Sequence, residues 1–511
     1  MPNQPLPLYT AEQVRNLDRA AIEDFGVDGF DLMKRAGKAA FRLARRRWPE
    51  ARQLLVLCGG GNNGGDGYVV AGLAAQQGIA CHCVAVSNPS KLSGTAASAF
   101  AFARESGVDV ISFESLDEGQ FGALLAESDL VVDTLLGTGL AGEVRAPYAG
   151  VIDQLNASPV PVLAVDIPSG LCSGTGRVLG TAVRAAATIT FIGRKAGLYT
   201  GRARDCTGPV SFDDLSVDPA VHDAEPEPAA WLWSPEAALT HLPRRHPTTH
   251  KGECGRVLVV GGDEGMGGAG ILAGEAALRC GAGLVFLATR GAHVPAALAR
   301  RPEIQARAVE HGNDLDPLLE RVDVVVVGPG LGSSAWGQQM LQRVAGFSGP
   351  VVADADALAL MQQQGVPADA GQWILTPHPG EAARLLGASV PEVEADRYQA
   401  LATLVEQQGA TVILKGAGSL VGAPGRTPAV IEGGNPGMAT AGMGDVLSGA
   451  LGALLGQGLG PFGAAVTGAA WHAAAADHAL ERTGSHGLLA GDLTEAFGVA
   501  TAAVFPEVER D

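Results

Sequence analysis

The sequence lacks any apolar run long enough to cross a membrane, because Gly, Arg or Asp interrupts each of the longest candidates. Its first residues carry no basic stretch followed by an apolar one, so we expect no secretory signal. Charged residues make up only 18% of the 511 residues, against 47% hydrophobic residues. Because a disordered chain needs the opposite balance, we predict globular domains, and the length favours two or three of them.

Cysteine and positive charge are also scarce. The seven cysteines are scattered without a CxxC pair, which is typical of reduced thiols in a cytoplasmic protein rather than of a disulfide framework. Cys81 and Cys83 flank His82, which leaves a metal site open, but their segment (IACHCVAV) has the pattern of a buried strand. The net charge of −18 argues against a nucleic-acid backbone as partner, since binding it needs a basic face. A phosphorylated small molecule is not excluded, because backbone N–H groups can bind it.

A segment rich in proline and acidic residues divides the chain near residues 215–245. It has little helix or strand periodicity, as expected of a linker. We therefore predict a first domain over 1–220, a linker over 221–244 and a second domain over 245–511. The two halves show no sequence repeat, which argues against a duplication.

Both halves alternate apolar strands with helices. In the first half a helix begins near Thr10 and Gln13, which have capping-box spacing, and near-continuous apolar strands follow. Polar motifs come directly after the strands: GGGNNGGDG after Cys58, TLLGTGLAGE after Asp133 and IPSG after Asp166. Open α/β sheets bind ligands at the carboxyl ends of their strands, so this coincidence predicts an α/β fold with a site at that edge. The second half repeats the order with other motifs, among them GPGLG, DADAL, TPHPGE and GMGD.

The polar motifs of the first half suit an anion and a cation. The loop GGGNNGGDG can present backbone N–H groups to a phosphate, with a structural turn as the alternative. It is not the GxGxxG fingerprint, which disfavours a dinucleotide-dependent dehydrogenase. Asn63, Asp133 and Ser169 offer oxygen ligands that suit a monovalent cation, whereas a helix cap or a satisfied carboxylate is the alternative for Asp133. Asp166 is a candidate general acid or base, or a ligand of a ribose hydroxyl.

Residues 8–217 resemble the epimerase domain of the NAD(P)H-hydrate repair enzymes. The motifs that carry the resemblance are TAEQVRNLD, LMKRAG, GNNGGDG, VVDTLLGTGL, AVDIPSG and FIGRKAGL. The resemblance implies a Rossmann-like three-layer sandwich, catalysis by Asp166, and a potassium ion held by Asn63, Asp133 and Ser169. Lys195 takes the place of a basic residue near the site. The residues implied in binding the hydrate are Asn62, Asn63, Gly64, Gly65, Asp66, Gly137, Thr138, Gly139, Leu140, Ala141, Gly142, Glu143, Tyr148 and Asp166.

Residues 245–505 are similar to the dehydratase domain of the same enzymes, which has a ribokinase-like fold. The matching motifs include HKGECGRVLVVGG, GPGLG, DADAL, LTPHPGE, LKGAGS and NPGMATAGMGDVLSG. The resemblance implies that ADP is a co-substrate. Asp263 departs from the family, which has Ser there, and its charge disfavours an anion at this loop. The residues implied in binding the hydrate are Ala269, Gly332, His378 and Asp445, and those implied in binding the nucleotide are Lys415, Gly416, Ala417, Gly418, Ser419 and Gly444.

The GMGD motif indicates a chemistry of its own. N–H groups at the start of a helix stabilise charge on a phosphate, and Asp445 can take a proton from a substrate hydroxyl. Mg²⁺ is expected to neutralise the phosphate charge. A simple N-cap is the alternative for Asp445, but Gly442 and Gly444 open the loop for close approach of a ligand. We interpret His378 as a binding residue, with a catalytic base as the alternative.

These observations predict a bifunctional isomerase and lyase that repairs hydrated NADH and NADPH. The first domain would interconvert the R and S hydrates, and the second would dehydrate the S hydrate at the expense of ADP, giving AMP and phosphate. Two alternatives stay open: a sugar or vitamin kinase in the second half, and a non-catalytic nucleotide-binding scaffold in the first. We expect NADHX, NADPHX and ADP as small-molecule partners, no nucleic acid or membrane, and a homo-oligomer.

Overall fold

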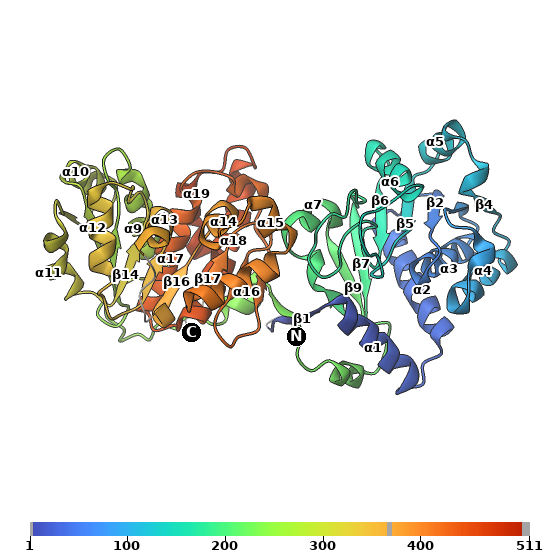
Figure 1. Ribbon diagram of the computed structural model, residues 1–511, viewed down its shortest axis with the longest axis horizontal. Helices are drawn as coiled ribbons and strands as arrows, with labels where there is room; N and C mark the ends of the chain where they lie inside the picture. Colours follow the sequence, from blue (N-terminus) through green and yellow to red (C-terminus); the bar gives the residue numbers. More distant parts are fainter. Residues whose placement is uncertain (1–3, 365–369, 503–511) are drawn as a thin grey trace, which may run out of the picture. The chain divides into compact units, whose positions relative to one another are not determined.

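The computed structural model describes residues 4–364 and 370–502, which fold into two compact units (Figure 1). One unit spans Pro7–Ala230, and the other is formed by the described residues up to Leu6 together with the chain from Trp231 onward. No helix in the described part of the chain is long and apolar enough to cross a membrane.

The first unit is built on a sheet of parallel strands in the order β4-β3-β2-β5-β6-β7-β9. The strand order reverses between β2 and β5, which places a topological switch point where the Gly-rich loop and Asp133 occur. A short strand, β1 (Leu6–Tyr9), pairs in parallel with β8 (Arg194–Lys195), and neither strand belongs to this sheet. The strands of the sheet are β2 (Gln53–Cys58), β3 (Ala80–Ala85), β4 (Val110–Ser112), β5 (Leu130–Thr134), β6 (Val162–Val165), β7 (Ala187–Phe191) and β9 (Val210–Asp213).

Helices cover both faces of this sheet, which makes the three layers expected from the sequence (Figure 1). One face packs against α1 (Ala11–Glu23), α2 (Gly29–Arg47), α3 (Asn62–Gln76) and α4 (Gly94–Glu105). The other packs against α5 (Glu118–Ala126) and α6 (Tyr148–Ala157). The capping box at the start of α1 is confirmed, because the Thr10 hydroxyl accepts from the Gln13 N–H and the Gln13 side chain accepts from the Thr10 N–H.

The second unit has a mixed sheet in the order β13-β12-β11-β14-β15-β16-β17-β18-β19-β10. Its strands are parallel except that β18 runs antiparallel to β17 and β19. The order reverses between β11 and β14, so a second switch point lies beside the loops that follow these strands. The strands are β10 (Ala230–Trp233), β11 (Arg256–Val260), β12 (Leu284–Thr289), β13 (Gln305–Ala308), β14 (Val324–Val327), β15 (Val351–Ala353), β16 (Trp373–Leu375), β17 (Thr411–Leu414), β18 (Leu420–Gly422) and β19 (Ala429–Ile431).

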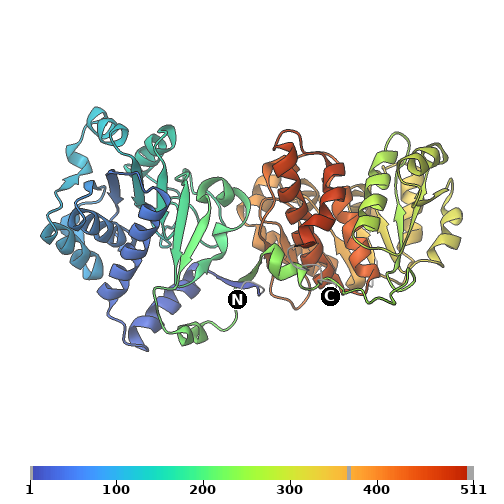
Figure 2. The ribbon, with the colours of Figure 1, turned by 180° about the vertical axis from the view of Figure 1, so that it is seen from behind.

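Helices again cover both faces of the sheet. Figure 2 shows one face from behind, where the main apolar core packs against α9 (Gly267–Arg279), α17 (Met443–Gly456), α18 (Pro461–Thr483) and α19 (Ala490–Ala502). Figure 1 shows the opposite face with α12 (Ala335–Val344), α13 (Asp356–Gln364), α14 (Pro379–Leu386) and α16 (Arg397–Gln408). Helix α17 begins directly after the Gly-rich loop, as the sequence predicts.

The segment 221–244, predicted as a linker, is instead built into both units. Val221 is fully buried in the core of the first unit. Strand β10 pairs in parallel with β19, and the short helix α8 (Pro235–Leu239) buries its apolar side chains in the second unit. Two of the prolines in this region, Pro219 and Pro235, begin helical turns, where a missing N–H costs no hydrogen bond. The first domain therefore ends at residue 230 and the second begins at residue 231.

Close packing of α9 against α17 generates the first prediction. A Cβ at Gly449 of α17 would lie 2.0 Å from the carbonyl oxygen of Ala273 in α9, so Gly449→Ala should destabilise the second domain by about 1–3 kcal/mol. Gly463→Ala in α18, where a Cβ meets nothing within 4 Å, is the control and should be neutral or stabilising. Urea unfolding followed by tryptophan fluorescence measures this, because five of the six tryptophans lie in the second domain. Equal midpoints for the two variants would contradict the packing.

Candidate active sites

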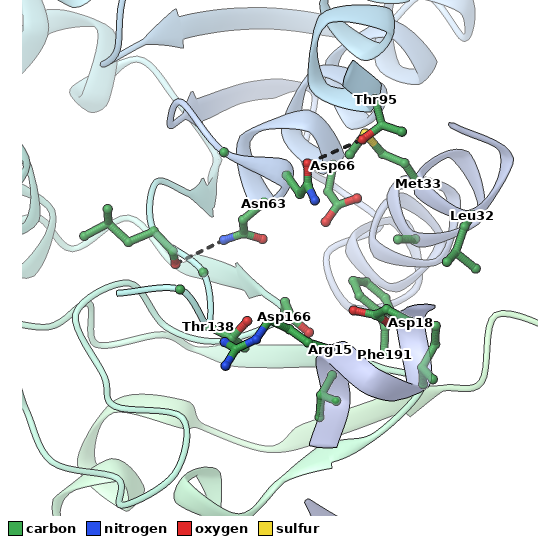
Figure 3. A pocket seen from close by; sticks show the side chains of 18 of the residues that line it. Arg15, Asp18, Leu32, Met33, Asn63, Asp66, Thr95, Thr138, Asp166 and Phe191 are labelled. Carbon is green, nitrogen blue, oxygen red and sulfur yellow. Dashed lines mark hydrogen bonds between the residues drawn. The ribbon is translucent and has the colours of Figure 1, made fainter. Parts of the chain in front are cut away.

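A cavity of about 680 Å³ lies in the first domain where the loops after β2 and β5 meet α1, α2 and α3 (Figure 3). Gly64 and Gly65 lie beneath it, where a Cβ would come within 2.1 Å of the Gly59 carbonyl oxygen and 2.5 Å of the Met33 sulfur. Gly142 and Glu143 are exposed and outside its lining. The predicted binding residues that line it are Asn62, Asn63, Asp66, Gly137, Thr138, Gly139, Leu140, Ala141, Tyr148 and Asp166.

The three predicted cation ligands meet around the backbone of Leu136, just below the cavity. Asp133 is fully buried and accepts hydrogen bonds from the Ser169 N–H at 2.9 Å and the Ser169 hydroxyl at 2.6 Å. The Asn63 side-chain amide donates to the Leu136 carbonyl at 3.2 Å, while Asn63 Oδ1 is buried without a hydrogen-bond partner. Burial raises the pKa of Asp133 to about 6, although the hydrogen bonds from Ser169 oppose the shift.

Asp166 and Lys195 form an ion pair at the wall of the cavity. Lys195 is 1% exposed, and its ammonium also donates to the Phe191 carbonyl at 3.2 Å. Asp166 has a φ of 66°, a left-handed conformation that is strained for a residue with a Cβ and is typical of functional sites. The structure thus brings together the catalytic candidate and the basic residue that the sequence placed in separate motifs.

Asp18 of α1 is a third acidic side chain in this cavity, beside Asp66 and Asp166 (Figure 3). Burial raises the pKa of Asp18 to about 6 and raises that of Asp66 well above its ordinary value, and repulsion from Asp166 adds to both shifts. Asp18 is not among the site residues that the sequence predicted. Its signal is a charged residue four positions after Val14, on the apolar face of the predicted first helix.

In the second domain, Asp445 lies in the first turn of α17. Gly442 occupies the N-cap position with a φ of 92°, so Asp445 is not the N-cap and the alternative of a simple cap is wrong. Burial and repulsion from Asp354 raise the pKa of Asp445 to about 7, against the attraction of Lys415. The carboxyl is therefore suited to accept a proton near neutral pH.

The predicted nucleotide-binding residues 415–419 follow β17. Gly416 and Ala417 are exposed, and Arg397 is buried beneath the loop, where it donates to the carbonyls of Leu414 and Lys415 at 3.1 and 3.2 Å. Unlike the exposed residues that follow it, Lys415 directs its ammonium toward the interior of the domain. It binds Asp354 at 2.7 Å, next to α17.

The remaining predicted hydrate-binding residues lie at helix starts and in turns. His378 is the N-cap of α14, and its Nδ1 accepts from the Gly380 N–H at 3.0 Å. The proton of the neutral ring is then on Nε2, which lies 3.4 Å from Glu381 Oε1, so a ligand would share this nitrogen with the Glu381 carboxylate. Ala269 lies in the first turn of α9, and the N–H of Gly332 donates to Asp356 at 2.8 Å.

Comparisons with known proteins cover nearly the whole chain. The family described as NAD(P)H-hydrate dehydratase matches residues 257–497, and the family described as YjeF-related protein N-terminus matches residues 29–197. The bifunctional NAD(P)H-hydrate repair enzyme Nnr of Coxiella burnetii is 45% identical over 487 residues, 95% of this chain and 97% of that one. The enzyme of the same name from Escherichia coli is 45% identical over 508 residues, 99% of this chain and 95% of that one. The chain belongs to this family of bifunctional NAD(P)H-hydrate repair enzymes.

The fold agrees with membership of the repair-enzyme family. A crystal structure of a hypothetical protein from Streptococcus mutans aligns with a TM-score of 0.50 and 27% identity, covering 53% of this chain and 99% of that one. The predicted fold class is confirmed: the protein has two α/β domains, of which the second is ribokinase-like.

Asp263, where this repair enzyme departs from the family pattern, is compensated within the structure. Arg290 Nε donates to one of its oxygens at 2.8 Å and the Ser334 hydroxyl to the other at 2.5 Å. Although burial opposes ionisation, these donors hold the pKa of Asp263 below its ordinary value. The expected penalty for an anion at this loop is therefore offset by the guanidinium of Arg290.

The raised pKa of Asp18 generates a stability prediction. The folded pKa of about 6 lies above the ordinary value of 3.8, so stability falls as pH rises through this window and the buried carboxyl must ionise. Asp18→Asn should stabilise the first domain by about 1–2 kcal/mol at a pH above 7, and the gain should vanish below pH about 4. Hydrogen–deuterium exchange of β2 in the full chain measures it. The exposed Asp24→Asn at the end of α1 is the control, and a gain that does not depend on pH would contradict the account.

Proposed function

We propose that this protein restores NADH and NADPH from their hydrates in two steps, one in each domain. The first domain interconverts the R and S hydrates, and the second dehydrates the S hydrate while ADP is converted to AMP and phosphate. The observation that carries the proposal is the presence of both family domains in one chain, each with its acidic groups at a switch point. The free cysteines of the described residues suit the reducing cytoplasm, which we propose as its compartment.

In the second domain we assign the proton transfer to Asp445. Its carboxylate removes the proton of the substrate hydroxyl, whose oxygen attacks the terminal phosphorus of ADP as AMP leaves. The lone pair of the ring nitrogen then expels phosphate, and loss of a proton from the adjacent ring carbon restores the dihydropyridine. The N–H groups of the first turn of α17 offset the negative charge on the phosphoryl group.

Mg²⁺ supplies neutralisation of the phosphate charge when it is bound. The part of the chain that the structure describes holds no group of three His, Cys, Asp or Glu side chains placed to bind a metal. The buried carboxylate of Asp354 is already bonded by Lys415 and Ser448. The side chains around Asp354 therefore fit a Mg²⁺ ion that is coordinated mainly by the phosphates of the nucleotide, rather than one coordinated only by protein side chains.

In the first domain, epimerisation needs the hydroxyl to leave and return at the carbon beside the ring nitrogen. The nitrogen lone pair expels the oxygen, a carboxylic acid protonates it to water, and water adds from the other face as its proton returns to the carboxylate. Arg15 and Lys195 are two cations for the three carboxyls that line the cavity. Burial favours the protonated form of Asp18 and Asp66, so either can hold the proton that is donated. Asp166, bound to Lys195, faces the positive charge that develops on the ring.

Asn63, Asp133 and Ser169 are the residues that would hold the potassium ion. Asn63 Oδ1 supports this assignment, because it is a buried oxygen that lacks a hydrogen-bond partner. One carboxylate with neutral oxygens suits a large monovalent cation, which loses its water at lower cost than Mg²⁺. The bound ion would link the loops after β2, β5 and β6.

The two activities should be separable. Asp445→Asn should abolish ADP-dependent dehydration and leave epimerisation unchanged, because an amide cannot accept the proton. Since the pKa of Asp445 is raised to about 7, the wild-type dehydration rate should rise with pH up to about 7 and level off above it. The measurement is recovery of dihydronicotinamide absorbance from pure S hydrate, together with release of AMP and phosphate.

Asp166→Asn is the matched control in the other domain. It should dehydrate pure S hydrate normally and fail to convert the R hydrate. Loss of both activities in a folded Asp445→Asn protein would contradict the two-site proposal. Accumulation of a phosphorylated vitamin precursor, with no repair of the hydrate, would favour the kinase alternative.

Potassium should accelerate epimerisation relative to a bulky organic cation at equal ionic strength. Asp133→Ala should remove this dependence together with most epimerase activity, because it deletes the carboxylate ligand, while dehydration continues in the second domain. If Asp133 only holds its loop, the variant loses stability and keeps the cation response. Equal epimerase rates in the two cations, with wild-type protein freed of potassium, would exclude a functional ion.

A further inference from the structure

Asp354 is a buried carboxylate that the proposed reaction does not use. It follows β15 and is 1% exposed. Both of its oxygens are bonded: Lys415 Nζ donates to Oδ1 at 2.7 Å, and the Ser448 hydroxyl lies 2.8 Å from Oδ2. A buried carboxylate is costly unless such donors accompany it, so its position depends on these two side chains and theirs on it.

The partners of Asp354 connect it to the loop that carries Asp445. Ser448 lies in α17, and its hydroxyl is also 2.9 Å from the carbonyl oxygen of Gly444. A Cβ at Gly444 would lie 3.2 Å from Asp354 Oδ2 and 3.3 Å from Lys415 Nζ. The ion pair therefore lies directly against the first turn of α17, and glycine leaves the room for it.

A second acidic group fixes the ammonium from another side. Glu381 of α14 is 6% exposed, and its Oε2 lies 3.9 Å from Lys415 Nζ. The ammonium thus lies between two buried carboxylates and next to the N–H groups that begin α17. The two carboxylates offset the charge of the ammonium and fix its position, so the ammonium and the N–H groups that begin α17 are hydrogen-bond donors beside Asp445.

We propose that Asp354 is a positioning residue that holds the Lys415 ammonium against Gly444, so that Lys415 contacts the phosphoryl group in transfer rather than the remainder of the nucleotide. The proposal rests on the proposed dehydratase function and refines the role expected for Lys415 from the sequence. Lys415 then acts mainly in the transition state, where the negative charge on the transferred group is greatest.

The same arrangement controls the proton acceptor. Burial is the largest cause of the raised pKa of Asp445. Three charged groups that face Asp445 also shift this pKa: Asp354, Asp356 and Lys415. Asp354 and Asp356 raise the pKa of Asp445, and Lys415 lowers it. Removing the charge of Asp354 should therefore lower the pKa of Asp445, and removing the charge of Lys415 should raise it.

The test compares Asp354→Asn, Lys415→Gln and Ser448→Ala in the full chain, with kcat and KM for ADP measured on S hydrate across pH. Asp354→Asn should lower kcat about tenfold to a hundredfold with little change in KM for ADP. The acidic limb of its plot of kcat against pH should move to lower pH. Lys415→Gln should also lower kcat, but its limb should move to higher pH. Ser448→Ala removes a neutral donor to Asp354 and keeps both charges of the ion pair, so it should lower kcat less than Asp354→Asn does and leave the acidic limb of the pH–rate profile near its wild-type position.

Two results would overturn the proposal: a raised KM for ADP with kcat preserved in Lys415→Gln, or acidic limbs that do not move in opposite directions. Should Asp354→Asn fail to fold, Lys415→Gln alone decides through the KM and kcat split and the direction of its limb. Epimerase activity of each variant reports that the chain is intact. Absence of dehydration in the wild-type protein would instead contradict the proposed function itself.

Discussion

A carboxylate buried at the end of a parallel strand is costly unless a cation or a hydrogen-bond donor accompanies it, and both sites are organised around this constraint. Asp133, Asp166 and Asp354 lie at the carboxyl ends of β5, β6 and β15. Their partners are Ser169, Lys195 and Lys415, each of which comes from a different loop. Satisfying the carboxylates therefore draws the loops together around each site.

Among the described residues of the two sites, three carboxyls other than the proposed cation ligand Asp133 lack an ion-pair partner and have a raised pKa, and these three are suited to proton transfer. In the described part of the chain, Asp18, Asp66 and Asp445 form no salt bridge, and burial raises the pKa of each. Neighbouring fixed carboxylates add to these shifts by repulsion: Asp166 acts on the first two, and Asp354 acts on Asp445. Paired groups thus hold the geometry and tune the unpaired ones, which are placed to exchange protons near neutral pH.

Local sequence patterns predicted the sheets and the loops that meet at the first site, whereas most residues assigned to the second site came from the family resemblance and stay predictions. Apolar runs followed by polar motifs predicted the strands, and the rule that ligands bind at the carboxyl ends brought Asn63, Asp133 and Ser169 together. Residues whose roles depend on distant partners were not predictable in this way. Asp18 lines the cavity only because α1 packs over it. The positioning role proposed for Asp354 depends on its ion pair with Lys415, 61 residues later in the sequence. The segment 221–244 was misjudged because proline at helix starts resembles a linker in composition.

In the proposed function, two sites in one chain act in series on one substrate pool. The most direct measurement supplies the wild-type protein with an equal mixture of the R and S hydrates of NADH and excess ADP, and follows dihydronicotinamide absorbance to its end. The account predicts complete recovery, with AMP formed in equal amount to the repaired cofactor. Recovery that stops when the S hydrate is consumed, or recovery at full rate without any nucleotide, would contradict it.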